Sequence, residues 1–259
     1  MGKPRVAFFK LSSCAGCQLS SLNIEPILLD VLSVVDIKYF VMAKRDNYGG
    51  PYDIGFVEGA VTSPRELEEL KKIREECGVV VAMGTCACFG GIPSIKNFCG
   101  MTQKQIEAKV YTELWDIKSM PVYGIDYYVD VDYYLRGCPI DKDEYLVLIK
   151  SLLKGINPLF RFHSVCNECI LKENVCLLIN KRKPCMGSVT ASGCGALCPS
   201  LGRECEGCRG PASDCNAESL AKVFINELDL TRADVARKFR KYAGNTPEFS
   251  KGVGQYECY

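Results

Sequence analysis

CNECILKENVCLLINKRKPCMGSVTASGCGALCPSLGRECEGC runs from Cys166 to Cys208 and contains eight of the chain's 17 cysteines. Two, six, eight, eight, three, six and two residues separate successive cysteines. Large apolar residues between them are too few for an ordinary core, so we expect disulfides or metal to hold the segment in shape. The thiols divide into two sets of four, one opening and one closing with C-x-x-C. This division suits two four-cysteine sites for iron–sulfur clusters or zinc.

Composition favours a soluble protein of one or two domains. The 259 residues are 47% hydrophobic and 24% charged, with a net charge of +1. Lysine and arginine are spread along the chain, so no basic patch indicates a nucleic acid partner. Neither a membrane span nor a secretory signal is predicted. We therefore expect a cytoplasmic chain, and in a reducing compartment clustered cysteines are more often metal ligands than disulfides.

The first 157 residues alternate short apolar runs with helical patterns, which predicts a flavodoxin-like, doubly wound parallel α/β sheet. The run at 78–83 is continuously apolar, as in a strand buried on both faces. A loop, GTCACFGG, is expected at 84–91. The expected strands cover 4–9, 37–42, 52–57, 78–83 and 131–135, and the expected helices cover 17–34, 63–76, 102–110 and 141–153.

Two helix starts carry capping signals. Ser63 is followed by Pro64 and by Glu66 three residues after the cap, and Asp141 is followed by Glu144. After a boundary near Gly155–Pro158, residues 158–259 are expected to form a second, loop-rich domain. Two short amphipathic helices, one around Leu220 and one from Thr231, should close the chain.

Four more cysteines follow predicted strands. The carboxyl ends of parallel strands share one edge of a sheet, so residues more than 120 positions apart can meet there in one four-cysteine site. Neighbouring glycines would let the backbone approach a bulky cluster. Buried structural thiols and a redox-active C-x-x-C remain alternatives. The four are Cys14, Cys17, Cys86 and Cys138, and the glycines are Gly16, Gly84, Gly90, Gly91 and Gly137.

Five motifs in this order carry a resemblance: SCAGCQ (13–18), VEGA (57–60), GTCACFGG (84–91), GCP (137–139) and CEGCRG (205–210). Together they resemble the small, electron-transferring subunit of nickel–iron hydrogenases. They are most similar to the delta subunit of cytosolic NAD(P)-linked hydrogenases, the sulfhydrogenases, over essentially the whole chain. The resemblance implies a flavodoxin-like domain with a proximal 4Fe-4S cluster. It also implies an iron–sulfur-stapled domain with medial and distal clusters.

The resemblance also implies a ligand set for each of the three 4Fe-4S clusters. Cys198 stands where many periplasmic members have proline and a three-iron medial cluster, so it implies four irons here. His163 precedes Cys166 with the H-x-x-C spacing of a histidine ligand that those members use. Cys166 and Cys169 repeat this spacing one step later and already complete a set of four thiolates, so His163 is left out of the ligand set. The sets are Cys14, Cys17, Cys86 and Cys138 (proximal); Cys166, Cys169, Cys176 and Cys185 (distal); and Cys194, Cys198, Cys205 and Cys208 (medial).

Five cysteines remain outside these sets. Cys88 competes with Cys86 as a proximal ligand and ranks second, because the family motif places the ligand directly after Gly-Thr. The other four are interpreted as structural thiols, with a Cys215–Cys258 pair left open: Cys77, Cys99, Cys215 and Cys258.

The implied function is electron relay, with no bond-making chemistry on this chain. Its partners would be a nickel–iron large subunit and a flavin or iron–sulfur subunit that reduces the acceptor. The acceptor itself stays open among NAD(P), a deazaflavin coenzyme and a heterodisulfide reductase. A zinc-stabilised interaction module and the proximal-cluster subunit of respiratory complex I are the competing hypotheses. Four basic residues lie near the distal ligands in the sequence: Lys172, Lys181, Arg182 and Lys183. One hypothesis is that they help to dock the acceptor subunit, and the other is that they are ordinary solvated charges.

Overall fold

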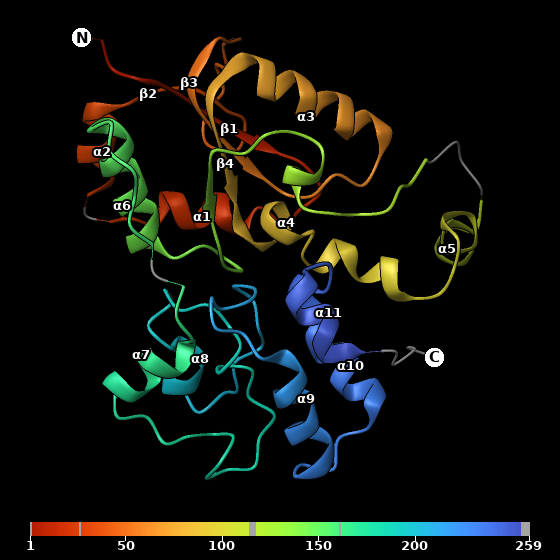
Figure 1. Cartoon of the computed structure of the whole chain (residues 1–259). Helices are drawn as coiled ribbons and strands as arrows, with labels where there is room; N and C mark the ends of the chain where they lie inside the picture. Colours follow the sequence, from red (N-terminus) through yellow and green to blue (C-terminus); the bar gives the residue numbers. More distant parts are fainter. Residues whose placement is uncertain (1, 26, 114–117, 161, 255–259) are drawn as a thin grey trace. The chain divides into compact units, whose positions relative to one another are not determined.

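The computed structural model describes residues 2–25, 27–113, 118–160 and 162–254 (Figure 1). The chain divides into two compact units. Unit 1 comprises Met1–Pro93 and Thr102–Pro158, and unit 2 comprises Ser94–Met101 and Leu159–Tyr259. Among the described residues, no helix has both the length and the apolar character needed to span a bilayer.

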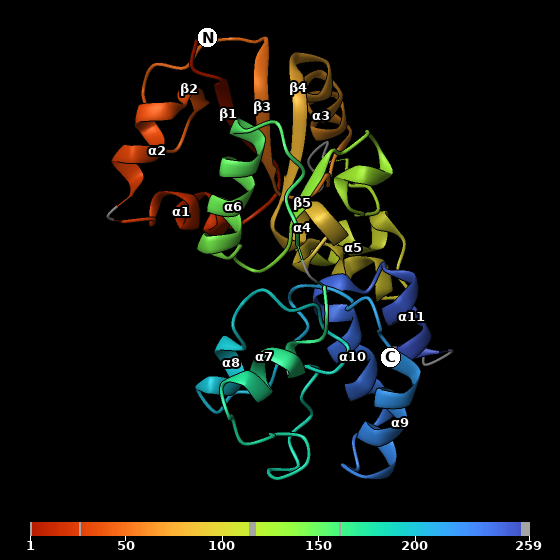
Figure 2. The ribbon, with the colours of Figure 1, turned by 60° about the vertical axis from the view of Figure 1, so that its left-hand side comes forward.

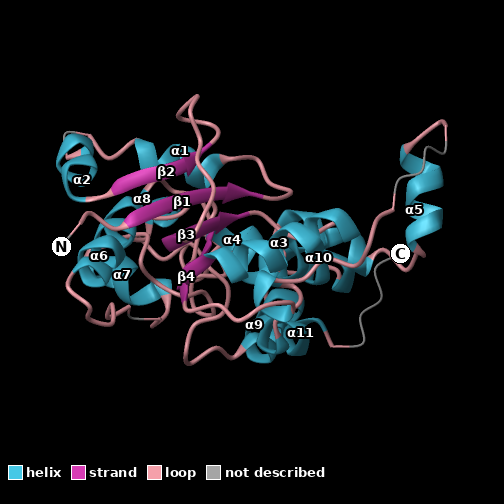
Figure 3. Cartoon of the chain, turned by 90° about the horizontal axis from the view of Figure 1, so that it is seen from above, coloured by secondary structure: helices cyan, strands magenta, loops and turns pink. Residues whose placement is uncertain are grey.

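Unit 1 is built on a five-stranded parallel sheet of order β2-β1-β3-β4-β5, which confirms the predicted flavodoxin-like fold. Figure 3 shows β2, β1, β3 and β4 side by side in this order. The strand order changes direction at β1, which pairs with both β2 and β3. The strands are β1 (Arg5–Lys10), β2 (Asp36–Phe40), β3 (Tyr52–Glu58), β4 (Cys77–Met83) and β5 (Tyr133–Leu135).

Helices cover both faces of this sheet, with α1 (Gly16–Leu22), α2 (Leu28–Val34) and α6 (Lys142–Leu153) on one side and α3 (Pro64–Glu76) on the other (Figure 2). Alternate residues of each strand serve opposite faces. Phe8 stacks on Phe56, which meets Tyr145 of α6. The next residue along each strand joins the core under α3, where Leu70 and Ile73 are buried.

Both predicted helix caps are present. Asp141 accepts hydrogen bonds from the backbone N–H groups of Asp143 and Glu144. Ser63 Oγ accepts from Glu66 N at 3.4 Å, but the Glu66 carboxylate binds the Thr62 N–H at 2.8 Å and does not complete the box on Ser63. The helix predicted over 102–110 is α5 (Gln103–Val110), with a complete capping box between Thr102 and Gln105.

Three expectations about local structure are wrong. The helix expected over 17–34 is divided into α1 and α2, and Pro26, which lies outside the described residues, stands between them in the sequence and has no N–H to donate to a helix. The loop expected at 84–91 begins with helix α4 (Gly84–Phe89), followed by the 3₁₀ helices η1 (Ile92–Phe98) and, further on, η2 (Ile125–Tyr127). A third helix, α11 (Pro247–Val253), follows the two expected near the end of the chain.

Unit 2 combines long loops with short helices: α7 (Val165–Leu171), α8 (Leu197–Ser200), α9 (Ala217–Asn226), α10 (Arg232–Ala243) and α11. The last three pack on one another through Phe224, Phe239 and Phe249, with Phe239 meeting Phe249 edge to face at 5.4 Å. Around the cysteines the apolar core is small. Val165, Ala196 and Cys205 are buried there, with Cys169, Cys185 and Cys194 packed against them.

Candidate metal centres

One group of cysteines gathers at the carboxyl edge of the sheet in unit 1. Cys14 follows β1, Cys17 lies on α1, Cys86 lies on α4 directly after β4, and Cys138 follows β5. The thiol of Cys86 interacts electrostatically with those of Cys138 and Cys14, and the thiol of Cys17 interacts with those of Cys138 and Cys86. The fold therefore brings together the four thiols that the sequence placed at strand ends, beside the point where the strand order reverses.

Glycines make room for three of these sulfurs. A Cβ atom added to Gly84, where φ is +86°, would lie 2.3 Å from the Sγ of Cys17. At Gly91, where φ is +53°, it would lie 2.8 Å from the Sγ of Cys86, and at Gly16 it would lie 3.2 Å from the Sγ of Cys14. Any larger residue would occupy the space that the sulfurs use, so the glycines form a cradle around the thiols.

Burial and hydrogen bonding act in opposite directions on these thiols. Burial raises the pKa of Cys17 and raises the pKa of Cys86 to about 12, and the neighbouring thiols add to both shifts. Backbone N–H groups of Ile140 and Ile92 face these two sulfurs and favour the thiolates. Such buried, N–H-facing thiols suit a cationic iron core, which compensates the charge of the thiolates that bind it.

Glu58, at the end of β3, is a component of this site that sequence reasoning did not single out. Its side chain is 2% exposed and accepts hydrogen bonds from the backbone N–H groups of Cys17 (3.2 Å) and Gln18 (3.0 Å). Burial raises the pKa of its carboxyl group, and the two backbone donors act against that shift. Glu58 thus fixes the turn that presents Cys17. Its position at a strand end, inside VEGA, was the available signal.

Cys88 points away from the other thiols. It is buried in the core under α3, and its S–H faces the carbonyl oxygens of Ala82 and Leu135 at 3.6 Å each. An S–H that donates to carbonyl groups favours the protonated thiol, which is not the ligating form. The geometry thus supports the preference for Cys86.

Replacing Cys88 with alanine should leave the iron content of the protein unchanged. Only a small buried side chain is lost, so the free energy of unfolding should fall by roughly 1 kcal/mol. Iron analysis and urea unfolding test this expectation. Loss of about four irons per chain would instead make Cys88 a ligand.

A second group of cysteines surrounds a cavity of about 330 Å³ in unit 2. Burial raises the pKa of Cys166 to about 11, and the thiols of the other three cysteines contribute to the shift. The Sγ of Cys185 accepts the backbone N–H of Cys205 at 3.3 Å. The four cysteines that line the cavity are those assigned together by sequence: Cys166, Cys169, Cys176 and Cys185.

The third group is only partly assembled in the structure. Burial raises the pKa of Cys205, and the neighbouring thiol of Cys208 raises it further. Cys194 packs against the same small core as Cys205. Cys205 also lies against Cys185 of the second group, so the two groups are adjacent. Cys198 is exposed on α8, and its place in this group stays a prediction.

Arg209 is a second component that sequence reasoning missed. Directly after Cys208, it is 1% exposed, and its Nε donates to the carbonyl oxygen of Ser192 at 2.7 Å. It therefore links the loop before Cys194 to the loop that ends at Cys208. Burial raises the pKa of Cys194, whereas the Arg209 guanidinium favours the Cys194 thiolate.

His163 and the other described thiols have different surroundings. His163 is exposed, and its carbonyl oxygen accepts from Ser192 N. Cys77 is buried against Gly55, and the Cys99 S–H donates to the Lys96 carbonyl oxygen. Cys215 is half-buried, and Cys258 lies outside the described residues.

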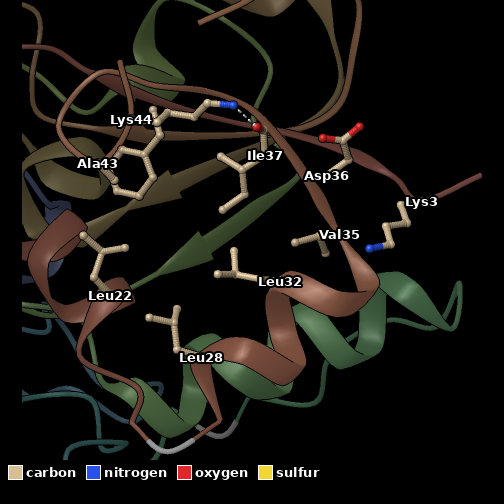
Figure 4. A pocket seen from close by; sticks show the side chains of 10 residues that line it. Lys3, Leu22, Leu28, Leu32, Val35, Asp36, Ile37, Ala43 and Lys44 are labelled. Carbon is tan, nitrogen blue, oxygen red and sulfur yellow. Dashed lines mark hydrogen bonds between the residues drawn. The ribbon is translucent and has the colours of Figure 1, made fainter. Parts of the chain in front are cut away.

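A larger cavity, of about 570 Å³, lies beside the edge strand β2 (Figure 4). Leu22, Leu28 and Leu32 line it, with Lys3 and Lys44 among the polar residues. No cysteine is among the described residues that line it, and Asp36 is the one carboxylate there, so the larger cavity does not offer the thiol set of an iron–sulfur site.

The donor sets fit iron–sulfur clusters in chemical type. All sixteen described cysteines are free thiols. Each candidate group offers soft sulfur ligands, and backbone N–H groups face several of the sulfurs. Within the described part of the chain, no three His, Cys, Asp or Glu side chains lie close enough together to hold a single metal ion.

Several known proteins are similar to this chain in sequence. The family model described as "NADH ubiquinone oxidoreductase, 20 Kd subunit" matches residues 14–152. The chain is 36% identical over 240 residues to sulfhydrogenase 2 subunit delta of Pyrococcus furiosus, covering 92% of this chain and 99% of that protein. It is 32% identical to a subunit of the F420-non-reducing hydrogenase vhu of Methanococcus voltae, covering 93% of this chain and 95% of that protein.

Solved structures show the same fold. A chain of an NAD⁺-reducing [NiFe]-hydrogenase in the H2-reduced state superimposes with a TM-score of 0.55 and 28% identity, covering 61% of this chain and 96% of that chain. A chain of the Ni-Fe-Se hydrogenase of Desulfomicrobium baculatum superimposes with a TM-score of 0.59 at 16% identity, over 82% of this chain and 96% of that chain.

Proposed function

This chain belongs to the family of the 20 kDa subunit of NADH ubiquinone oxidoreductase, among its hydrogenase small subunits, and on that premise we propose that it transfers electrons within a cytoplasmic nickel–iron hydrogenase. The observation that carries the proposal is the convergence of four thiols from the ends of three strands, β1, β4 and β5, with glycines that make room for three of the sulfurs. A structural zinc site would not require this assembly at the ligand-binding edge of a sheet.

Three 4Fe-4S clusters are proposed, each held by one of the cysteine sets assigned from the sequence. Unit 1 would hold the proximal cluster, and unit 2 the medial and distal clusters. When bound, each cluster would accept and release one electron at a time. This chain's residues supply the rest: thiolates hold the iron, backbone N–H groups stabilise the sulfurs, and Glu58 fixes the turn at Cys17.

Two companions complete the proposed assembly. A nickel–iron large subunit would oxidise dihydrogen, and a flavin or iron–sulfur subunit would reduce the acceptor. The relatives include subunits of an NAD-reducing hydrogenase and of a coenzyme F420 hydrogenase, so related chains belong to enzymes named for different acceptors. We therefore assign the choice of acceptor to the companion subunit and electron transfer to this chain.

Metal and sulfide analysis tests the proposal directly. Anaerobically purified protein should be brown and contain about 12 irons and about 12 acid-labile sulfides per chain, from three sites of four. An iron chelator with an oxidant should bleach it. A colourless protein that contains zinc without sulfide would establish the zinc-stabilised module instead.

A further inference from the structure

Helix α2 in unit 1 packs less closely than its composition predicts. Five of its seven residues are aliphatic, in the sequence LLDVLSV, but none of the seven is buried. Helix α6, which lies on the same side of the sheet, has five buried residues (Figure 2). An aliphatic helix normally gains stability by burying one face against its neighbours, so the packing of α2 on the sheet is incomplete.

The cavity of about 570 Å³ lies between α2 and β2. Figure 4 shows Leu28 and Leu32 of α2 on one side of it and Ile37 of β2 opposite them. Phe40, at the end of β2, is 1% exposed and lines the same cavity. Water finds few hydrogen-bond partners on such walls, and the volume lies in the range of roughly 300–1,000 Å³ that is typical of small-molecule sites. The cavity therefore has the size and the walls of a site for an apolar ligand.

Two ammonium groups border these aliphatic walls. Lys3 and Lys44 line the cavity, and the Lys44 Nζ donates to the carbonyl oxygen of Ile37, a neutral partner, at 2.6 Å. Asp36 is the one carboxylate among the described residues that line the cavity, and it forms an ion pair with Lys38 at 2.7 Å. The hydrogen bond from Lys38 lowers the pKa of Asp36, and the charges of Lys44 and Lys3 lower it further. The border thus keeps a net positive charge, which matches an anionic group.

A peptide strand is a poor occupant, because the loop that follows β2 already uses backbone groups of that strand. The backbone N–H of Tyr48 donates to the carbonyl oxygen of Lys38 at 3.0 Å. The side-chain Oδ1 of Asn47 accepts the backbone N–H of Phe40 at 2.6 Å. Addition of a strand needs such groups to be free at the edge of the sheet. An acyl chain needs none of them, since it binds through contact with apolar walls.

We propose that this cavity binds a single-chain amphiphile with an anionic head group, a long-chain carboxylic acid. The acyl chain would lie among the leucines of α1 and α2, and the carboxylate would meet Lys3 and Lys44 at the border. Its binding would complete the packing of α2 on β2. The inference goes beyond the proposed electron transfer, because the residues that line the cavity include none of the proposed iron ligands.

Equilibrium dialysis of radiolabelled laurate against the whole, anaerobically purified hydrogenase complex tests the proposal. The wild-type complex should bind one laurate per copy of this chain, and the binding should saturate. Dodecyltrimethylammonium has the same chain length and the opposite charge, so it should bind at least about 10-fold more weakly. Laurate should also slow the hydrogen exchange of residues 27–44, because α2 gains apolar contacts.

The decisive variant is Leu32→Glu, at a position of α2 that lines the cavity and is 39% exposed. A carboxylate there would lie in the acyl site and repel the head group, so the dissociation constant of laurate should rise at least about 100-fold. The matched control is Leu29→Glu, on the same helix, where the leucine is 74% exposed and is not among the lining residues. This control should bind laurate like the wild type, and both variants should keep the wild-type iron content.

Charge reversal tests the contact with the head group. Lys3→Glu combined with Lys44→Glu should raise the dissociation constant of laurate about 10-fold and remove the preference over dodecyltrimethylammonium. Arg45→Glu is the control, because Arg45 is exposed and adjacent to Lys44 in the sequence but is not among the lining residues. It should leave both quantities unchanged. Equally tight binding of the two amphiphiles by the wild type would contradict the proposed anionic head group.

Three other results would overturn the proposal. The first is a wild-type complex that takes up no laurate, as when α2 closes on β2 or a companion subunit covers the cavity. The second is equal affinity of Leu32→Glu and the wild type for laurate. The third is sedimentation of the wild-type complex with vesicles of phosphatidylserine and phosphatidylcholine without uptake of free laurate, which would make α2 a membrane contact. Iron content and hydrogen-linked dye reduction test the proposed function separately, and their absence from the wild-type complex would refute that function alone.

Discussion

Replacing Gly84 with alanine should remove the iron from the site in unit 1. The added Cβ would lie 2.3 Å from the Sγ of Cys17, on a backbone whose φ of +86° disfavours any side chain. The strain of positive φ costs about 1–2 kcal/mol, and the overlap forces Cys17 out of place. We expect iron per chain to fall by about four, the content of one cluster, as measured by chemical analysis and electron paramagnetic resonance.

Gly155 provides the matched control. Its φ of +65° imposes a similar backbone penalty, but a Cβ there would meet no atom within 4 Å. Gly155→Ala should therefore lose stability through the backbone alone and keep all of its iron. The difference between the two variants measures the overlap with Cys17. Equal iron contents in both would show that the glycine cradle has no part in metal binding.

Replacing Arg209 with glutamine should lower the reduction potential of the cluster proposed between Cys194 and Cys208. A buried positive charge stabilises the more negative, reduced state of a nearby cluster. At an effective dielectric constant near 20 the interaction is worth about 1–2 kcal/mol, which corresponds to on the order of 50 mV for one electron. A redox titration followed by electron paramagnetic resonance should show the shift.

The same substitution should destabilise unit 2. Arg209 is 1% exposed and donates to Ser192, so its removal costs about 1.5–3 kcal/mol for a hydrogen bond from a charged group. Arg209→Lys should restore most of the potential, because it keeps the charge, but only part of the stability. Arg203→Gln, at an exposed arginine, is the control and should change neither quantity. An unchanged potential in Arg209→Gln would leave this arginine with a structural role alone.

Much of unit 1 follows from local sequence signals. The apolar run at 78–83 predicted a strand buried on both faces, and the alternation of strands and helices predicted the sheet. Caps at Ser63 and Asp141 are short-range and were correct in position. The division of the helix expected over 17–34 was missed because helical apolar spacing continues through Pro26 and was given more weight than the proline.

The thiols themselves were identified by sequence, because their density in 166–208 and their positions after strands are features of the chain alone. Their surroundings were not. Three of these contacts join residues up to 67 positions apart in the sequence. Gly84 faces Cys17, Glu58 accepts the Cys17 N–H, and Arg209 lies buried beside Cys194. Exposure of Leu171 and Leu201 was equally hidden, since an aliphatic residue in the sequence ordinarily predicts core. The order of residues along the chain thus predicted the candidate sulfur ligands and the fold that gathers four of them in unit 1. Which sulfurs have room, which charges are buried and which apolar side chains remain in water emerged only in the folded molecule, because these are properties of packing between distant segments.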